Sequence, residues 1–460
     1  MQLNELRNKN IHLLGLSGTE GSSLALFFID LGYKNLFGHD FSPPAQFKKN
    51  YITYHENLSL KVINQQINKI RTNFKTINFQ KNYLKDIDEA DVIFAPSSWF
   101  RYKINQPLKR AVPKKIFWNW YNLILAYYPG KIVGVTGTAG KGTTTNLIYQ
   151  ILKAAQKNVW LIGESWQSMP LSQIINGGPN SWVVVEVSNR TLTFAKNVKK
   201  SPAISVITNI TKNHLDDHGG SFKKYIAVKE EIGRYQNKND YLILNSDNVI
   251  TKKLKNLGQG KKIFYSYKNP ERKLIKNENI IGQHFIADAV AAIKVAKILK
   301  IRKSIICQAL KKFKARPGRM QFIKRIQDIT FINDAASTRP EVTIEAIKSF
   351  PKKSVHLILE GSRYKPDKKQ FLKLIKAIIQ QKVKRVVVSG QIADFLYPLL
   401  QKAGVNSLKT KRLIESLKVI SSLAKPQENV LFSPSCESFG EFKDYRERII
   451  AFNQFIKKLK

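Results

Sequence analysis

The stretch Lys131-Ile132-Val133-Gly134-Val135-Thr136-Gly137-Thr138-Ala139-Gly140-Lys141-Gly142-Thr143-Thr144-Thr145 decides the fold of this chain. It opens with an apolar run typical of a buried strand and continues with a loop of glycines and threonines. A segment with apolar residues at helical spacing follows. A strand, a glycine loop and a helix in this order direct backbone N–H groups and a positive helix end at phosphates. The stretch therefore predicts a nucleotide site.

The residues of this loop are those that phosphate chemistry requires, although their spacing departs from the usual G-x-x-x-x-G-K-[ST] pattern. We expect Lys141 to reach the β- and γ-phosphates of a nucleotide. Gly142 stands where a metal-binding hydroxyl is usual, so Thr143 is the next candidate for that hydroxyl. An ordinary strand–turn–helix is the alternative interpretation. The expected cofactor-binding residues of this stretch are Gly137, Thr138, Gly140, Lys141, Gly142, Thr143 and Thr144.

Length and composition indicate a globular protein of several domains. At 460 residues the chain has room for about three domains of ordinary size. Two cysteines cannot form a disulfide framework and favour a reducing compartment. The sequence shows no run long enough to span a membrane and no signal-peptide pattern at its first residues. We expect a cytoplasmic monomer without a membrane span.

The formal charge of +44 is the most unusual number in the composition. Such a charge is typical of nucleic-acid binders. Here, however, the basic residues are spread over the whole length, without a basic tail or a block of like charges. We therefore expect no nucleic-acid partner. A basic, nucleic-acid-binding NTPase remains an alternative, and it predicts activity that nucleic acid stimulates and salt suppresses.

Apolar strand-like runs followed by glycine loops and helical segments recur in every third of the chain, which predicts an α/β fold. We expect a Rossmann-like N-terminal domain over residues 1–128, where a strand from Ile11 leads into the loop at Ser17. Residues 129–316 are expected to form a central ATP-binding domain of the P-loop type with a parallel sheet. Residues 317–460 are expected to form a second Rossmann-like domain.

Polar residues at the ends of two further strands extend the predicted site. Glu186 ends the apolar strand that starts at Trp182, where a carboxylate is well placed for Mg²⁺. His214 follows the next strand, although a single histidine is more often structural. Lys229 lies on a helical segment beside two glutamates, and by itself this pattern predicts a solvated helix lysine.

Nine motifs follow one another along the chain. They are LLGLSGTEGSS, GTAGKGTTT, VVVEVSN, ITNITKNHLDDH, YIAVKEEI, GQHFIADAVAA, RPGRMQF, INDAASTRP and LFSPSCESFGEFKDY. In this order they resemble the Mur ligases, the ATP-dependent amino-acid-adding enzymes of peptidoglycan synthesis. The resemblance spans nearly the whole chain and is strongest to the branch that adds D-glutamate. Asp288 and Ala336 depart from the family pattern, which has an asparagine and a lysine at these places.

The resemblance implies roles for residues at matching positions. It implies ATP and Mg²⁺ as cofactors, catalytic roles for Lys141, His214 and Lys229, and carbamylation of Lys229. Implied metal ligands are Thr143, Glu186, His214 and Lys229. Implied nucleotide contacts from the third domain are Arg319 and Asp334. Implied contacts to the UDP-sugar substrate are Gly15, Ser17 and Ser188. Implied contacts to the incoming amino acid are Thr338, Lys365, Ser438 and Tyr445.

The implied reaction is amide formation between UDP-N-acetylmuramoyl-L-alanine and D-glutamate. ATP would phosphorylate the carboxylate, and the amino group would then attack the acyl phosphate. Charge accumulates on the transferred phosphoryl group, which explains why lysine, arginine and Mg²⁺ are expected to converge there. Another Mur or folylpolyglutamate-type amino-acid ligase is the alternative within the same chemistry.

Overall fold

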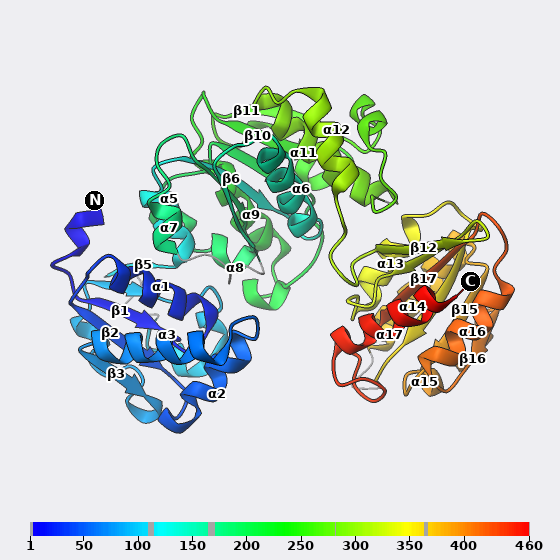
Figure 1. Ribbon diagram of the computed structural model, residues 1–460, viewed down its shortest axis with the longest axis horizontal. Coiled ribbons are helices and arrows are strands. Elements are labelled where there is room, and N and C mark those ends of the chain that lie inside the picture. Colours follow the sequence, from blue (N-terminus) through cyan, green and yellow to red (C-terminus); the bar gives the residue numbers. More distant parts are fainter. Residues whose placement is uncertain (1–2, 109–114, 164–170, 281, 363–366, 460) are drawn as a thin grey trace. The chain divides into compact units, whose positions relative to one another are not determined.

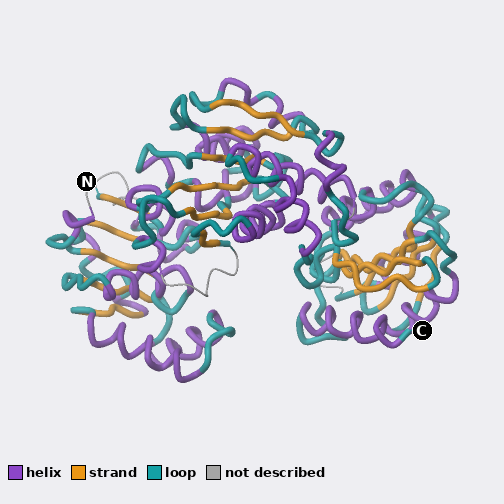
Figure 2. Tube along the Cα trace, turned by 45° about the horizontal axis from the view of Figure 1, so that its top comes forward, coloured by secondary structure: helices purple, strands orange, loops and turns teal. Residues whose placement is uncertain are grey.

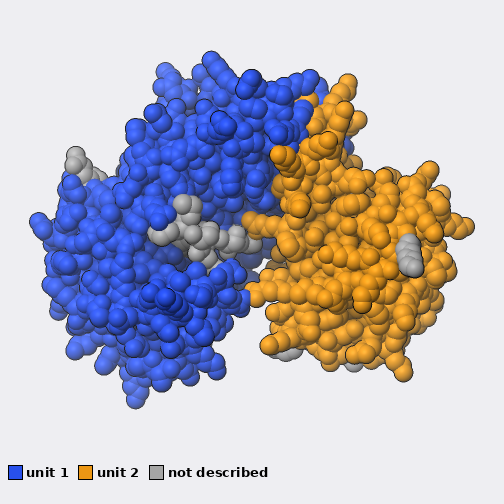
Figure 3. All heavy atoms as spheres, in the orientation of Figure 1, with its two compact units in different colours: residues 1–271, 287–309 blue, residues 272–286, 310–460 orange. Residues whose placement is uncertain are grey.

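The computed structural model describes residues 3–108, 115–163, 171–280, 282–362 and 367–459. The chain divides into two compact units, residues 1–271 with 287–309 and residues 272–286 with 310–460 (Figure 3). Unit 1 contains two β-sheets and unit 2 contains one. Within the described ranges, no helix combines the length and the apolar character that a membrane crossing needs. The predicted α/β fold is confirmed.

The first sheet of unit 1 is five-stranded and parallel, in the order β3-β2-β1-β4-β5 (Figure 1). Its central strand β1 is buried at all four residues, as its apolar run predicts. The strands are β1 Ile11–Leu14, β2 Leu36–Asp40, β3 Thr76–Phe79, β4 Val92–Phe94 and β5 Ile116–Trp118. The helices are α1 Thr19–Asp30, α2 Pro44–Tyr54, α3 Leu60–Asn73 and α5 Trp120–Tyr127.

The second sheet of unit 1 is six-stranded and fully parallel, in the order β11-β10-β9-β6-β8-β7. The phosphate-loop strand β6 therefore lies between β9 and β8. The strands are β6 Lys131–Thr136, β7 Val159–Ile162, β8 Trp182–Glu186, β9 Ile204–Ile207, β10 Tyr241–Asn245 and β11 Lys261–Tyr265. The helices are α6 Lys141–Ala154, α7 Leu171–Ile175, α8 Asn189–Leu192, α9 Phe222–Arg234, α10 Val249–Lys252, α11 Gly282–Ile298 and α12 Lys303–Lys312.

Unit 2 contains a mixed six-stranded sheet in the order β12-β13-β17-β14-β15-β16, with helices on either side of the strands (Figure 2). Only β12 runs antiparallel to its neighbour among the described strands. The strands are β12 Gln321–Ile326, β13 Ile329–Asn333, β14 Val355–Glu360, β15 Arg385–Ser389, β16 Ser407–Lys409 and β17 Asn429–Ser435. The helices are α13 Pro340–Lys348, α14 Lys368–Gln381, α15 Ala393–Lys402, α16 Leu413–Leu423 and α17 Tyr445–Lys458.

One continuous hydrophobic core joins the two sheets of unit 1. Its buried residues run from Leu6 in the first sheet region to Leu244 on β10. A second, smaller cluster also joins the two sheet regions, and in it Phe117 stacks on Phe194 with ring centroids 5.5 Å apart. This shared core explains why residues 1–271 form one unit, even though they contain both sheets. The boundary expected at residues 128 and 129 falls between these sheets and stays a prediction.

Candidate active site

The glycine loop between β6 and α6 leaves no room for side chains at two positions. Gly137 has φ +156°, and an added Cβ would lie 1.9 Å from the Thr208 hydroxyl oxygen. Gly140, the residue before α6, has φ +80°, and an added Cβ would lie 2.4 Å from Oδ1 of Asp288. Both the backbone conformation and the close contacts therefore require glycine. The loop brings its backbone to the N-terminal end of a 14-residue helix, as the sequence predicts.

Residues that follow β9 hold this loop in place. The backbone N–H of Ala139 donates to Oδ1 of Asn209 at 2.9 Å, and the Thr208 hydroxyl donates to the Ala139 carbonyl at 2.5 Å. The Thr138 N–H donates to the Asn209 carbonyl at 2.8 Å. These bonds tie the carboxyl ends of β6 and β9 together and fix the shape of the loop.

The functional side chains of the loop lie on the first turn of α6. Lys141 begins the helix, and its Nζ donates to the carbonyl of Thr138 at 3.3 Å. Thr143 is partly exposed, whereas Thr144 is buried. The Thr144 hydroxyl has no hydrogen-bond partner among the described residues. The helix therefore places two hydroxyls one and two residues after Gly142.

Lys229 lies in the interior of unit 1, which corrects the expectation of a solvated lysine. Its side chain is 1% exposed on α9. Its Nζ donates to the hydroxyl of Thr136 at 3.2 Å and lies 5.2 Å from the centre of the Tyr225 ring. Burial lowers the pKa of Lys229 well below its ordinary value, and the positive charge of Lys141 lowers it further. The negative charge of Glu186 opposes this shift.

Lys141 and Glu186 thus both lie close enough to Lys229 to act on its charge, so three expected site residues come together. Glu186 ends β8 and pairs in register with Val135 of β6. Sequence reasoning missed Thr136 and Tyr225, which contact the amine of Lys229. Tyr225 precedes Lys229 by one helical turn, and this i,i+4 spacing was the available signal.

His214 lies in the loop that follows β9, seven residues after the last residue of that strand. It has φ +49°, and its carbonyl accepts a hydrogen bond from the N–H of Asp217 at 3.1 Å. Among the described residues, no three histidine, cysteine, aspartate or glutamate side chains form a ready metal cluster. A divalent cation at this edge would therefore need the hydroxyl of Thr143 or oxygens of a ligand in addition to Glu186.

Ser188, which was expected to contact a sugar nucleotide, belongs to a polar network in unit 1. The hydroxyl of Ser188 lies 2.8 Å from that of Thr191, which donates to the hydroxyl of Ser97 at 3.3 Å. The carboxylate of Glu20 accepts from the Ser97 N–H and hydroxyl at 2.8 and 3.0 Å. Burial raises the pKa of Glu20 to about 6. Ser97 and Thr191 carried no signal in the sequence.

The glycine loop of the first sheet lies between β1 and α1, just before Glu20 in the first turn of that helix. The N–H of Gly15 donates to the carbonyl of His39 at 2.7 Å, and the N–H of Ser17 donates to the carboxylate of Asp40 at 2.7 Å. Gly15 and Ser17, which were expected to contact the sugar nucleotide, therefore lie in the loop before α1, and this loop bonds to the last two residues of β2.

In unit 2, the expected nucleotide contact Asp334 is buried and already occupied by hydrogen bonds. Its carboxylate accepts from the N–H of Met320 at 3.1 Å and from the hydroxyls of Ser337 and Ser433 at 2.6 and 2.8 Å. Burial raises the pKa of Asp334 to about 6, and the charge of Arg319 opposes the shift. Asp334 thus fixes the turn that carries Arg319.

The residues expected to contact an amino acid lie on two neighbouring loops of unit 2. The Ser337 carbonyl accepts from the N–H of Ser435 at 3.0 Å, which holds the loop of Thr338 beside the one that continues to Ser438. Ser438 is buried and Tyr445 is 42% exposed. Lys365 lies outside the described residues.

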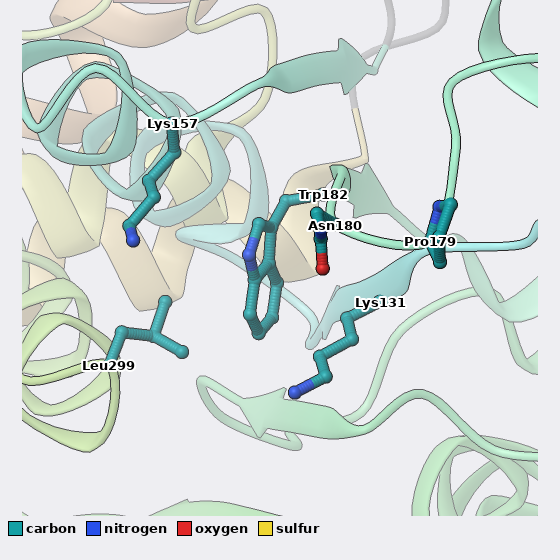
Figure 4. Close-up of a pocket in the computed structure, with 6 residues that line it drawn as sticks. All are labelled: Lys131, Lys157, Pro179, Asn180, Trp182 and Leu299. Carbon is teal, nitrogen blue, oxygen red and sulfur yellow. The ribbon is translucent and has the colours of Figure 1, made fainter.

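A cavity of about 330 Å³ lies at the opposite ends of the same strands (Figure 4). Lys131 and Trp182, the first residues of β6 and β8, line it together with Lys157, Pro179, Asn180 and Leu299. The glycine loop and Glu186 are at the carboxyl ends of these strands, where ligands of parallel sheets usually bind. This cavity is therefore separate from the candidate site.

Comparisons with known proteins agree with this geometry. Residues 135–306 match the family described as Mur ligase middle domain. The UDP-N-acetylmuramoylalanine--D-glutamate ligase of Pelotomaculum thermopropionicum is 31% identical over 74% of this chain and 78% of that protein. The protein of the same name from Caldanaerobacter subterraneus subsp. tengcongensis is 28% identical over 99% of this chain and 100% of that protein.

Solved structures share the fold at lower identity. The UDP-N-acetylmuramate-alanine ligase MurC of Thermotoga maritima has a TM-score of 0.57 and 20% identity, covering 98% of this chain and all of that one. A pseudomurein peptide ligase type C from Methanothermus fervidus has a TM-score of 0.54 and 19% identity, with the same coverage. These likenesses show the α/β architecture of the chain.

Proposed function

This chain belongs to the Mur ligase family, and we propose that it joins UDP-N-acetylmuramoyl-L-alanine to D-glutamate at the expense of ATP. It is a ligase of peptidoglycan precursors, and its relatives of 28–31% identity carry the D-glutamate name. The observation that carries the proposal is the convergence of Lys141, Glu186 and the buried amine of Lys229 at one sheet edge. A glycine loop opens onto the same edge.

The residues at this edge fit a nucleotide triphosphate with Mg²⁺. The loop backbone at Gly137 and Gly140 forms a cradle that any Cβ would fill, and Lys141 supplies the cation that phosphates need. Glu186 and the hydroxyl of Thr143 are oxygen donors of the kind that Mg²⁺ prefers. Mg²⁺ would neutralise charge on the transferred phosphoryl group when bound. His214 follows the adjacent strand and is proposed to contribute to the same site.

Lys229 is proposed to act in a modified form. A buried, neutral amine is a nucleophile, whereas an ammonium ion is not. Reaction of this amine with CO₂ would form an N–C bond and release one proton to solvent, which would give an anionic carbamate close to Glu186. Thr136 and Tyr225 would orient the group, because both contact the Lys229 amine. This proposal accounts for a lysine beside the glycine loop whose pKa burial holds well below its ordinary value.

In the proposed reaction, the carboxylate of the sugar peptide attacks the γ-phosphorus of ATP, the bond from this phosphorus to the bridging oxygen breaks, and an acyl phosphate and ADP result. The amino group of D-glutamate then attacks the acyl carbon, a proton leaves the nitrogen, and inorganic phosphate departs. Lys141 stabilises charge on the phosphoryl group by direct contact. Thr338, Ser438 and Tyr445, with Lys365, are proposed to bind the amino acid, since hydroxyl and ammonium groups suit its carboxylate.

The test is phosphate release from ATP and Mg²⁺ in the presence of UDP-N-acetylmuramoyl-L-alanine, with single amino acids added in turn. The proposal expects release that requires both substrates and is fastest with D-glutamate. The Lys141→Ala variant serves as the matched inactive control.

Other results of this assay have distinct meanings. Release with another amino acid would keep the ligase chemistry and overturn the D-glutamate assignment. Release stimulated by DNA or RNA and suppressed by salt would favour a nucleic-acid-dependent NTPase instead. No release with any sugar nucleotide would refute the proposed function.

A further inference from the structure

Two arginines in unit 1 share one carboxylate beside the residues expected to bind the sugar nucleotide. Nε of Arg190 donates to Oδ2 of Asp217 at 2.7 Å. Nε of Arg101 forms an ion pair with Oδ1 of the same residue at 3.4 Å. Arg101 comes from the first sheet region, whereas Arg190 and Asp217 follow β8 and β9 of the second. The cluster thus joins three loops of unit 1.

Both guanidinium groups contact Asp217 only through Nε. A structural clamp would use the paired N–H groups of the guanidinium in a bidentate contact, which is the strongest arginine geometry. Here neither arginine makes a hydrogen bond or ion pair through its Nη atoms to any residue that the structure describes. The Nη groups, eight N–H donors in total for two arginines, remain available to an anion.

Exposure and charge agree with this availability. The side chain of Asp217 is 6% exposed, that of Arg190 is 26% exposed and that of Arg101 is 54% exposed. The carboxylate is therefore the buried anchor and the guanidinium groups face outward from it. Two cations on one anion leave an excess positive charge, which an anionic ligand would neutralise.

The cluster lies next to the proposed reaction site. Arg190 is two residues after Ser188, and its neighbour Asn189 lies 3.1 Å from Nε2 of His218 through its side-chain amide. Asp217 bonds through its N–H to the carbonyl of His214. Burial lowers the pKa of His218, and the charges of Lys229 and Arg190 lower it further, so both of these side chains lie near its imidazole.

We propose that Arg101 and Arg190 form an anion-binding site for an acidic group of the sugar-nucleotide substrate, with Asp217 as the positioning residue. This inference rests on the proposed function, since it concerns the same substrate. The substrate carries two kinds of anion, a diphosphate and a carboxylate. Guanidinium forks bind both, so the chemistry of the site is shared and the experiment separates the two sources.

The experiment is a calorimetric titration of wild-type protein and variants with two ligands. UDP-N-acetylmuramoyl-L-alanine carries both anions, and UDP-N-acetylglucosamine carries the diphosphate alone. We expect Arg190→Met and Arg101→Met each to weaken binding of the first ligand about 10- to 100-fold, as for a lost charged hydrogen bond. Equal weakening of both ligands assigns the diphosphate, and weakening of the first alone assigns the carboxylate. ATP affinity should stay unchanged.

Two variants provide controls. Arg234→Met removes a comparably exposed arginine that pairs with Glu230 and Glu231 on α9, and it should leave both affinities unchanged. Asp217→Asn keeps both guanidinium groups and removes their negative anchor. If the arginines form an anion site, Asp217→Asn should bind the sugar nucleotide at least as tightly as Arg190→Met does. If the cluster is only a structural clamp, both variants should lose the same affinity for the sugar nucleotide, and both proteins should be less stable.

The outcomes separate the two proposals. If wild-type protein does not bind UDP-N-acetylmuramoyl-L-alanine, the proposed function fails and this inference fails with it. If wild-type protein binds and both arginine variants bind within twofold of it, only this inference is overturned. If Arg190→Met also loses ATP binding, Arg101→Met decides, because the exposed Arg101 side chain can be replaced without disturbing the interior.

Discussion

Replacement of Lys229 by methionine should stabilise the protein and inactivate it. The wild-type amine is 1% exposed, and its burial lowers its pKa well below the ordinary value of 10.5. Over a range of pH below 10.5, the Lys229 amine is therefore protonated in the unfolded chain and unprotonated in the folded protein. Stability is then lost as pH falls from 10.5 toward the folded-state pKa. Methionine has a similar length and no proton to bind, so the variant lacks this loss.

The magnitude follows from two opposing effects. The variant loses one hydrogen bond to the Thr136 hydroxyl, which costs about 1 kcal/mol, while that hydroxyl still donates to the carbonyl of Val187. Each pH unit between the two pKa values is worth about 1.4 kcal/mol to the variant. Near pH 10.5 the variant should be less stable by about 1 kcal/mol. About one pH unit lower, the lost hydrogen bond and the avoided loss of the lysine proton should roughly offset each other. At still lower pH, the variant should be more stable than the wild-type protein.

The assay is urea unfolding in CO₂-free buffer at pH 7.5 and pH 10.5, followed by tryptophan fluorescence. All six tryptophans lie in residues 99–182 and so report on unit 1, which contains Lys229. Lys224→Met, an exposed lysine of the same helix, is the matched control and should show no such pH dependence. Phosphate release by Lys229→Met should fall about 100- to 10,000-fold.

A variant that is less stable by the same amount at both pH values would refute this reasoning, because the amine would then be a favourable structural contact. Full activity of a stabilised variant would separately refute the catalytic role of Lys229.

Three further predictions concern other parts of unit 1. Lys141→Ala should lower ATP-dependent phosphate release by at least about 100-fold without changing the unfolding midpoint, since the side chain serves a developing charge. Gly140→Ala should weaken ATP binding in a titration by at least about tenfold, because φ +80° and a contact of 2.4 Å to Asp288 both disfavour a Cβ; unchanged affinity would contradict the described loop. Acid should destabilise unit 1 through His12, whose Nδ1 lies 2.8 Å from Nε2 of His39. Burial lowers the pKa of His12 to about 3, so stability should fall between pH 6.5 and pH 3, by about 2 kcal/mol at pH 5. His12→Phe should flatten that part of the pH profile in urea unfolding.

The sequence predicted strands and helices where apolar runs are long. It did not predict the strand whose position depends on a tight turn. The strands β6, β8 and β9 are runs of buried apolar residues, and each was expected. Strand β12 was missed because its side chains are mostly half-buried and show no clean alternation. The turn that pairs it with β13 consists of Gln327 and Asp328, both with positive φ. This hairpin lacks the glycine that normally marks such a turn.

The sequence singled out several residues of the candidate site, such as Lys141 and Glu186, but it did not show why the parts of the site meet. Thr136, Glu186 and Thr208 are far apart in sequence, and each ends or directly follows a strand. They converge because β6 lies between β8 and β9, and neighbouring strands are about 4.8 Å apart. The order of the strands depends on how the helices cover the sheet. No local pattern in a single sequence gives that order.

The same argument explains the error about Lys229. Its local sequence, with Glu230 and Glu231 next to it, is that of an exposed helix surface, and those two residues do pair with Arg234. A helix turns about 100° per residue, so Lys229 lies on the face of Tyr225 and Ile232, which packs on the sheet. A lysine on that face is costly unless its charge is removed or used. In a chain with 77 lysines and arginines, burial next to the glycine loop is therefore the property that distinguishes a lysine proposed to react from a solvent-exposed one.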